Sequence, residues 1–224
     1  MQSKPINILT VQFANEISQQ EIPLFRGAVI HSLENNSILF HNHDGERLRY
    51  SYPLIQYKRI KGKAAIVCVD EGVERVLELF SSTNFIYHIG ERVIDMRIET
   101  IDTKQVVLGC FEKEQYYRLQ NWLPLNSSNY EIYQKTEDLI SKVQLLERIL
   151  VGNILSLLKG MSIHIDQQIS LHITNITHQQ TINYKRVKLM AFDIDFKTNI
   201  TLPLHIGIGK NASVGFGVLF DKPA

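Results

Sequence analysis

Two histidines and a tyrosine lie in one polar stretch and could move protons to and from a reacting phosphate. His41 and His43 begin HNHDGERLRYSYPLIQYKR, and Tyr50 follows seven residues after His43. Histidine titrates near pH 6.5, which suits general acid and base work. Residues two apart in an extended segment point to the same side, so both imidazoles could face one substrate. The stretch also carries cations that can hold phosphates, namely Arg47, Arg49, Lys58 and Arg59.

Residue types alone leave two other interpretations of these histidines open. His41 follows Phe40 and could simply end a strand with its ring packed. His41, His43 and Asp44 could instead ligate zinc. Zinc usually takes three or four protein ligands, however, and no Cys/His cluster completes such a site.

Composition is that of an ordinary globular protein. The chain has 224 residues, of which 44% are hydrophobic and 21% charged, with a net charge of +1. A nucleic-acid binder this balanced must gather its basic residues on one face. Cys68 and Cys110 lie in apolar stretches and are expected to be buried, reduced thiols. There is no signal-peptide pattern, and no apolar run approaches the ~18–20 residues of a membrane span, so we expect a soluble, cytoplasmic protein.

The N-terminal half alternates strands and helices in the order β-α-β-β-α-β. This order is typical of a ferredoxin-like sandwich, the topology of RRM-type RNA binders. A 3.6-residue apolar period predicts the helices, and runs of apolar and β-branched residues predict the strands. The predicted strands are 6–13, 54–58, 64–70, 85–89 and 92–101, and the predicted helices are 20–33 and 73–80.

A second unit is predicted to begin where the composition turns polar, near Ser127. Apolar residues spaced by three and four predict a long helix over 136–159, with Gly160 as its C-terminal cap. Five strand-like runs follow, at 161–165, 169–176, 187–195, 201–206 and 214–220. We therefore predict an α+β protein of tandem ferredoxin-like (RRM-like) sandwiches with antiparallel sheets, divided into residues 1–126 and 127–224.

A glycine-rich segment, PLHIGIGKNASVGFGVLFD, ends the chain. Its glycines are Gly207, Gly209, Gly215 and Gly217. A Walker loop requires Ser or Thr after its lysine and then a helix, but Lys210 precedes Asn211 and a strand-like run. Two interpretations stay open. The glycines could close a hairpin between the last two strands, or their backbone amides could approach a nucleic-acid phosphate, aided by Lys210 and Asn211.

These two separated motifs together resemble a known family. The glycine-rich segment is similar to the C-terminal loop of the RAMP superfamily of CRISPR-associated RNA-binding proteins. The run RGAVIHSLENNSILFHNHDGERLRYSYPLIQYK, residues 26–58, resembles a block in one branch of its repeat-processing endoribonucleases. Residues 92–202 contribute only compatible patterning. The resemblance implies a metal-independent endoribonuclease that cuts precursor CRISPR RNA within its repeats and needs no cofactor.

The resemblance also assigns roles to residues. His43 matches the essential histidine of that branch, with His41 as its acid/base partner and Tyr50 as an orienting group or proton donor. Which histidine is the acid stays open. The expected RNA-binding residues are Arg47, Arg49, Lys58, Gly207, Gly209, Lys210, Asn211, Gly215 and Gly217. The rival interpretation is a non-catalytic RNA-binding module of the same fold.

The resemblance implies CRISPR repeat RNA as the main partner. It allows a homodimer and other CRISPR effector subunits as further partners, and no membrane. One more basic cluster, Tyr184-Lys185-Arg186-Val187-Lys188, places three cations at the start of a predicted strand. It is either a solvated edge that discourages strand pairing or an edge that faces RNA.

Overall fold

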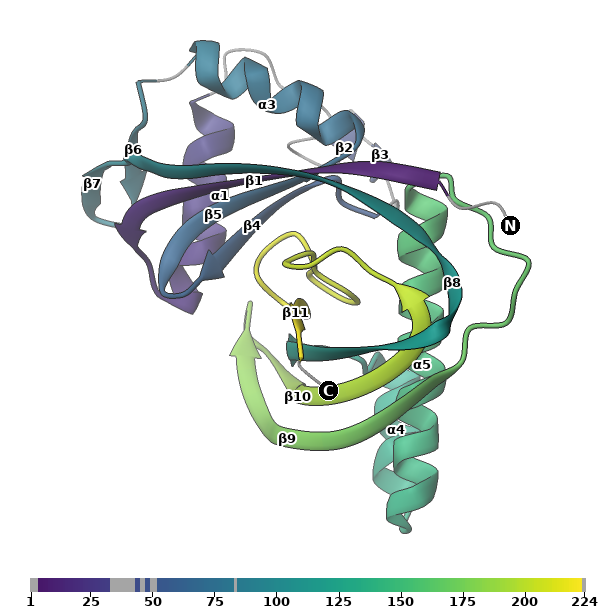
Figure 1. Cartoon of the computed structure of the whole chain (residues 1–224). Coiled ribbons are helices and arrows are strands. Elements are labelled where there is room, and N and C mark those ends of the chain that lie inside the picture. The colour runs from purple at the N-terminus through teal and green to yellow at the C-terminus, as the bar shows by residue number, and fades with distance from the viewer. Residues whose placement is uncertain (1–3, 33–42, 45–46, 49–51, 83, 223–224) are drawn as a thin grey trace. The chain divides into compact units, whose positions relative to one another are not determined.

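The computed structural model of the chain describes residues 4–32, 43–44, 47–48, 52–82 and 84–222. It divides into two compact units (Figure 1). One unit contains residues 5–107 together with 213–215, and the other contains residues 1–4, 108–212 and 216–224. The division falls between Val107 and Leu108, inside one long strand, whereas the boundary expected from composition lies after that strand, at 126/127.

The elements follow one another in a regular order. From the N-terminus they are β1 (Lys4–Glu16), η1 (Gln19–Glu21), α1 (Ile22–His31), β2 (His43–Asp44), β3 (Arg47–Leu48), β4 (Ile55–Ile60), β5 (Lys63–Val69), α3 (Glu71–Ser82), β6 (Ile86–Ile89), β7 (Arg92–Asp95), β8 (Ile98–Trp122), α4 (Ser127–Lys135), α5 (Leu139–Gly160), β9 (Leu171–Tyr184), β10 (Val187–Thr201) and β11 (Val218–Asp221).

The N-terminal unit has the strand order of a ferredoxin-like sheet. Its strands lie in the order β8-β1-β5-β4, with α1 after β1 and α3 after β5 in the chain. Counted along the unit, this is the order 4-1-3-2. The face of α1 that carries Ile22, Phe25 and Val29 is buried. The ring of Phe25 packs edge-on against Phe13 of β1 and Tyr57 of β4, at 5.7 Å from each, which ties this helix to the sheet.

The C-terminal unit repeats the same strand order. The second part of β8 lies between β11 and β10, and β9 pairs with the other edge of β10, all antiparallel. The order β11-β8-β10-β9 is again 4-1-3-2, so the predicted tandem ferredoxin-like fold is confirmed. The helix α5 follows β8. Residues 202–217, which contain the four glycines, occupy the position in the chain where a second helix would stand.

Three predicted elements are wrong in detail. The run 201–206 is no strand, because β10 ends at Thr201 and residues 202–206 belong to the irregular glycine segment. The run 161–165 is no strand, because Met161 caps α5 and its N–H donates to the carbonyl oxygen of Leu157. The helix predicted over 136–159 begins at Leu139 instead, and a separate helix, α4, which the sequence pattern did not predict, ends just before it. Thr136 ends α4, and Asp138 begins α5 by accepting a hydrogen bond from the N–H of Ser141 at 2.8 Å. None of the helices in the described part of the chain is long and apolar enough to span a membrane.

Candidate functional site

The stretch with the histidine pair joins two firmly packed elements of the N-terminal unit. On its N-terminal side α1 ends at His31, and Ser32 caps it. The N–H of Ser32 donates to the carbonyl oxygen of Ala28 at 3.1 Å, and its Oγ donates to that of Val29 at 2.8 Å. The segment therefore leaves α1 from a fixed point.

The C-terminal side of the stretch is anchored as well. Tyr52 is buried, and Nε2 of Gln56 donates to its hydroxyl at 2.7 Å and to the carbonyl oxygen of Pro53 at 2.9 Å. Burial raises the pKa of Tyr52, so this phenol stays protonated. The carbonyl oxygen of Leu54 then accepts from the N–H of Val69 in β5 at 2.9 Å. The chain re-enters the sheet in a fixed register.

Within the stretch, the structure describes a short antiparallel ladder. His43 lies opposite Leu48, and Asp44 lies opposite Arg47. The ladder places His43 and Arg47 on the two strands of one hairpin. The other predicted residues of the stretch, His41, Arg49 and Tyr50, lie outside the described residues. Their roles stay predictions.

Part of the C-terminal glycine segment belongs to this same unit. The N–H of Tyr57 donates to the carbonyl oxygen of Ser213 at 2.8 Å, and Tyr57 forms a parallel bridge with Val214. The side chain of Gln19 donates to the carbonyl oxygen of Gly215 at 2.9 Å. Residues 213–215 thus lie beside β4 and the start of α1, the two elements that flank the histidine stretch. The two motifs behind the family resemblance meet in one unit.

Gly215 is required by this contact. Its φ is +81°, and a Cβ there would lie 2.4 Å from Cδ1 of Ile22. Two of the other glycines are required inside the C-terminal unit. A Cβ on Gly217 would meet the carbonyl oxygen of Ile208 at 1.9 Å, and one on Gly209 would meet Oδ1 of Asn153 at 2.8 Å. Close backbone packing therefore accounts for glycine at these three positions.

In the middle of the glycine segment, residues 209–211 are not buried. Lys210 is exposed, and Gly209 and Asn211 are half-buried, with Asn211 at φ +59°. Gly207, Gly215 and Gly217 are buried. Of the predicted RNA-binding residues in this segment, Gly209, Lys210 and Asn211 are thus the ones that are not buried. Contact of any of them with RNA stays a prediction.

Lys58, the remaining predicted RNA contact, is inside the protein. It is 0% exposed and lies opposite Ala65 of β5. Desolvation lowers the pKa of its ammonium to about 7. Because the side chain has no solvent-accessible surface, a phosphate has no direct approach to it in this conformation, and an RNA contact at Lys58 stays a prediction.

The buried ammonium has a measurable consequence for stability. Its folded pKa of about 7 lies below the unfolded value of about 10.4. Between these values the unfolded chain binds more protons, so stability rises with pH. We expect this group to contribute a rise of about 1.4 kcal/mol in the free energy of unfolding between pH 6 and pH 8.

Urea denaturation of wild type and Lys58→Met at both pH values measures this contribution as the difference between the two slopes. Lys104→Met, at a 67% exposed side chain of the same unit, is the control and should keep the wild-type slope. Equal slopes in wild type and Lys58→Met would contradict the depressed pKa. The comparison does not go above pH 8, because burial also raises the pKa of Cys68, to about 12.

The C-terminal unit carries a basic turn at the end of a hairpin. Its residues belong to the cluster 184–188, which the sequence pattern placed at the start of a strand. Lys185 and Arg186 form the turn between β9 and β10 at φ +49° and +66°, and both are exposed, as is Lys188. Such two-residue turns favour Asn and Gly, because left-handed backbone costs a large side chain roughly 1–2 kcal/mol. Tyr184, at the base of this turn, packs edge-on against Phe216 at 5.2 Å. The turn therefore lies next to the glycine segment.

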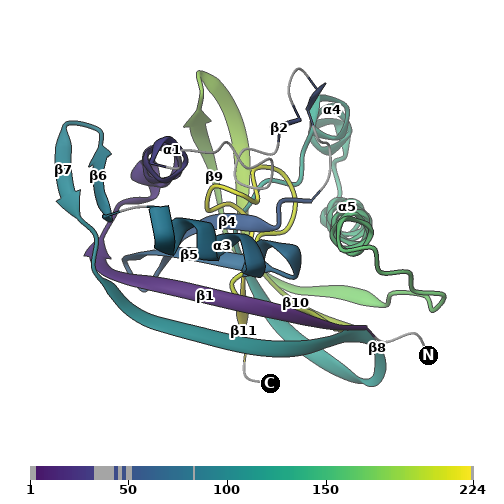
Figure 2. The same cartoon turned by 90° about the horizontal axis from the view of Figure 1, so that it is seen from above.

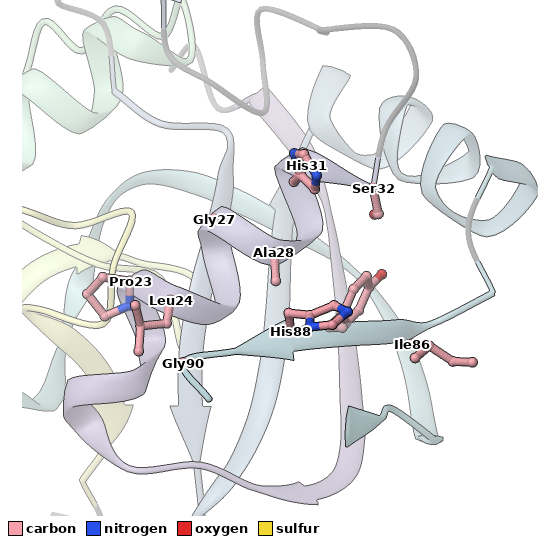
Figure 3. Close-up of a pocket in the computed structure, with 10 residues that line it drawn as sticks. Pro23, Leu24, Gly27, Ala28, His31, Ser32, Ile86, His88 and Gly90 are labelled. Carbon is pink, nitrogen blue, oxygen red and sulfur yellow. The ribbon is translucent and has the colours of Figure 1, made fainter. Parts of the chain in front are cut away.

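A pocket of about 550 Å³ lies between α1 and β6 (Figure 3). Most of its lining is apolar, including Pro23, Leu24 and Ile86, and it also contains His31 and His88. Both histidines are exposed. Among the residues that the structure describes, no lysine or arginine lines this pocket.

Among the residues that the structure describes, no group of three or more His, Cys, Asp or Glu could hold a metal ion. Cys68 and Cys110 are buried and unpaired, which confirms the prediction of buried thiols.

Comparison with protein families gives two adjacent matches. The model of the Cas6b N-terminal domain matches residues 4–107, and that of the Cas6b C-terminal domain matches residues 109–221. Together they cover both units, and they divide where the two units divide. An uncharacterized protein of Methanocaldococcus jannaschii is 33% identical over 103 residues, which span 46% of this chain and 69% of that protein.

Solved structures share the fold over nearly the whole chain. A crystal structure of Cas6b matches with a TM-score of 0.87 at 24% identity, covering 98% of this chain and 100% of the other. A crystal structure described as the CRISPR RNA processing endoribonuclease Cas6b matches with a TM-score of 0.75 at 23% identity, over 98% and 100% of the two chains. A type IV Cas6 crRNA endonuclease matches with a TM-score of 0.59 at 12% identity, with the same coverage.

Proposed function

Because the chain belongs to the Cas6b family, whose models match both of its units, we propose that it cuts precursor CRISPR RNA within the repeats. The observation that carries this proposal is the full-length likeness to a CRISPR RNA processing endoribonuclease, joined to a histidine pair between α1 and β4. With RNA transcripts as its substrate, the protein is proposed to act in the cytoplasm.

The chemistry uses the nucleophile that RNA carries. A histidine of the pair removes the proton of the 2′-hydroxyl, whose oxygen attacks the adjacent phosphorus. The 5′ oxygen of the next nucleotide leaves with a proton from the second acid, which is the other histidine or Tyr50. Arg47 and Arg49 stabilise the charge that develops on the phosphate. The upstream product ends in a 2′,3′-cyclic phosphate and the downstream product in a 5′-hydroxyl.

Two exposed groups of the C-terminal unit hold the RNA in this proposal. One is Lys210 with Asn211, at the surface of the glycine segment, and the other is the turn with Lys185 and Arg186. Smaller residues would be more stable in the left-handed conformation of this turn, yet it carries two cations. This strain favours the interpretation that the edge faces RNA over the interpretation that it is only solvated.

If the turn with Lys185 and Arg186 binds RNA, replacing it is expected to raise the stability of the protein and to weaken RNA binding. Replacing the turn by Lys185→Asn with Arg186→Gly supplies the preferred turn residues and removes two cations. We expect a higher unfolding temperature, about tenfold weaker binding of repeat RNA, and a salt dependence that is shallower by about two counterions. Differential scanning fluorimetry and filter binding over a salt series measure both. Unchanged affinity and salt slope would support the solvated-edge interpretation.

The reaction itself is tested on end-labelled repeat RNA. We expect a single cut, a downstream fragment that a kinase labels without prior phosphatase treatment, and an upstream fragment whose 3′ end the cyclic phosphate blocks. Binding without any cut under these conditions would show the non-catalytic RNA-binding module instead. A cut that leaves a 5′-phosphate would contradict attack by the 2′-hydroxyl.

A further inference from the structure

Asn153 is a polar residue in the middle of the long helix α5, which lies beside the glycine segment (yellow in Figure 2). Its Oδ1 accepts a hydrogen bond from Nε1 of Trp122 at 3.0 Å. Trp122 is the last residue of β8 and is completely buried. An indole N–H can only donate, so the oxygen of the amide must face the ring and the NH2 group must point away from it. This hydrogen bond therefore fixes the direction in which the amide of Asn153 points.

The NH2 group of Asn153 lies at the surface, next to Gly209. A Cβ on Gly209 would stand 2.8 Å from Oδ1 of Asn153 and 2.9 Å from Nε1 of Trp122, so the main chain of Gly209 lies against this hydrogen bond. Nδ2 is bonded to the same carbon as Oδ1 and is therefore close to Gly209 too. Asn153 is half-buried, and within the described part of the chain its Nδ2 has no acceptor and is not one of the buried unpaired atoms. Two N–H donors are thus available to a ligand at this point.

The backbone of residues 209–211 offers further donors at the same place. Among the described residues, the N–H groups of Gly209, Lys210 and Asn211 find no acceptor. Gly209 and Asn211 have φ values of +89° and +59°, whereas the φ of Lys210 between them is not positive. Alternation of this kind turns consecutive N–H groups toward one side, which makes a concave site for an anion. The side chain of Asn153 therefore adds donors to a backbone that is shaped for an anion.

We propose that Asn153 is a phosphate-binding residue: its NH2 group donates to a backbone phosphate of the repeat RNA at residues 209–211, and Trp122 orients it. The inference rests on the proposed function, because it takes the phosphate to be that of repeat RNA. Asparagine is a poor former of helix interiors, so its presence in α5 calls for a specific role. The alternative role is structural, namely to accept the hydrogen bond of the buried indole.

The substitution Asn153→Asp separates these two roles. A carboxylate oxygen accepts from Trp122 as the amide oxygen does, but the atom that replaces Nδ2 is a charged acceptor and repels phosphate. A residue that only satisfies the indole would therefore tolerate this change. We expect repeat RNA to bind at least about tenfold more weakly to Asn153→Asp, and about tenfold more weakly to Asn153→Ala, because each loses a hydrogen bond to a charged group.

The control is Gln134→Glu, which makes the same change from amide to carboxylate at an exposed residue of α4. Its affinity should stay within about twofold of wild type, because salt screens an exposed charge that is far from the RNA. Filter binding over a salt series measures all variants, and circular dichroism verifies that they fold. Asn153→Ala removes neutral donors and should keep the wild-type salt slope, whereas Lys210→Gln should make the slope shallower by about one counterion.

Repeat RNAs with one uncharged methylphosphonate, placed at each position in turn, identify the contacted phosphate. At that position the tenfold difference between wild type and Asn153→Ala should disappear, because the variant has no contact left to lose. If the wild type binds and cuts repeat RNA while Asn153→Asp and Asn153→Ala bind it equally tightly, this inference alone is overturned. A difference that persists at every methylphosphonate position would overturn it as well. A wild type that does not bind repeat RNA would instead refute the proposed function, and this inference with it.

Discussion

Replacing His43 by alanine is expected to lower the rate of repeat cleavage by about 10²–10⁴-fold while leaving RNA affinity within about threefold of wild type. The range is that of removing one general acid or base from a reaction. The affinity for RNA should be retained, because the substitution leaves the exposed cations of the C-terminal unit, Lys185, Arg186 and Lys210, unchanged. Single-turnover cleavage and filter binding on the same labelled RNA measure the two quantities.

The matched control is His88→Ala. His88 is an exposed histidine of the same unit, on β6, and it lies outside the segment between α1 and β4. It should cleave like wild type. If His43→Ala keeps the wild-type rate, or if His88→Ala loses as much activity, the assignment of the proton transfer to the hairpin of β2 and β3 is wrong.

Gly217→Ala is expected to destabilise the protein by at least about 3 kcal/mol. Two costs add. A φ of +58° places the new side chain in the left-handed region, and its Cβ would stand 1.9 Å from the carbonyl oxygen of Ile208. That oxygen is main chain and cannot move as a side chain could, because the N–H of Ile208 donates to the carbonyl oxygen of Gly217 at 2.8 Å. Urea denaturation gives the change in free energy.

Gly152→Ala provides the control for this substitution. Gly152 lies in the middle of α5, and nothing stands within 4 Å of the position that its new methyl group would take. Alanine there should stabilise the protein by up to about 1 kcal/mol, since it is the better helix former. Equal effects of the two substitutions would show that the glycine segment is not closely packed as described.

The order of elements in the N-terminal half could be predicted because each element carries a strong local pattern. The apolar spacing of Ile22, Phe25 and Val29 predicts the buried face that α1 shows. The same holds for α5, whose buried residues include Leu146, Leu150, Ile154 and Leu157. In both helices one face is packed on a sheet, so periodicity and burial agree.

The long strand β8 could not be predicted from alternation. Against β10 its register shifts twice, between Trp122 and Leu119 and between Gln115 and Cys110. Extra residues at each shift break the two-residue period that identifies a strand. The polar helix α4 was missed for a related reason, since Tyr133 is its only buried residue and leaves no apolar stripe.

The candidate site could be predicted only in part, because it brings together residues that lie far apart in the sequence. Residue types pointed to His43, but nothing local shows that Ser213 and Val214 lie beside Tyr57, more than 150 residues earlier in the sequence. The burial of a charged side chain also cannot be predicted from its neighbours in the sequence. The sequence predicts that the cation of Lys58 contacts phosphate, but the structure shows that this side chain is buried.

The central claim is that the RNA supplies its own nucleophile and that side chains of this protein move the protons. One measurement tests it most directly. Repeat RNA with a single 2′-deoxy sugar immediately 5′ of the cut is incubated with the protein in EDTA, beside the all-ribose RNA. We predict complete cleavage of the all-ribose RNA and none of the 2′-deoxy RNA, with both bound equally well. Cleavage of the 2′-deoxy RNA, or a requirement for magnesium with the natural RNA, would contradict it.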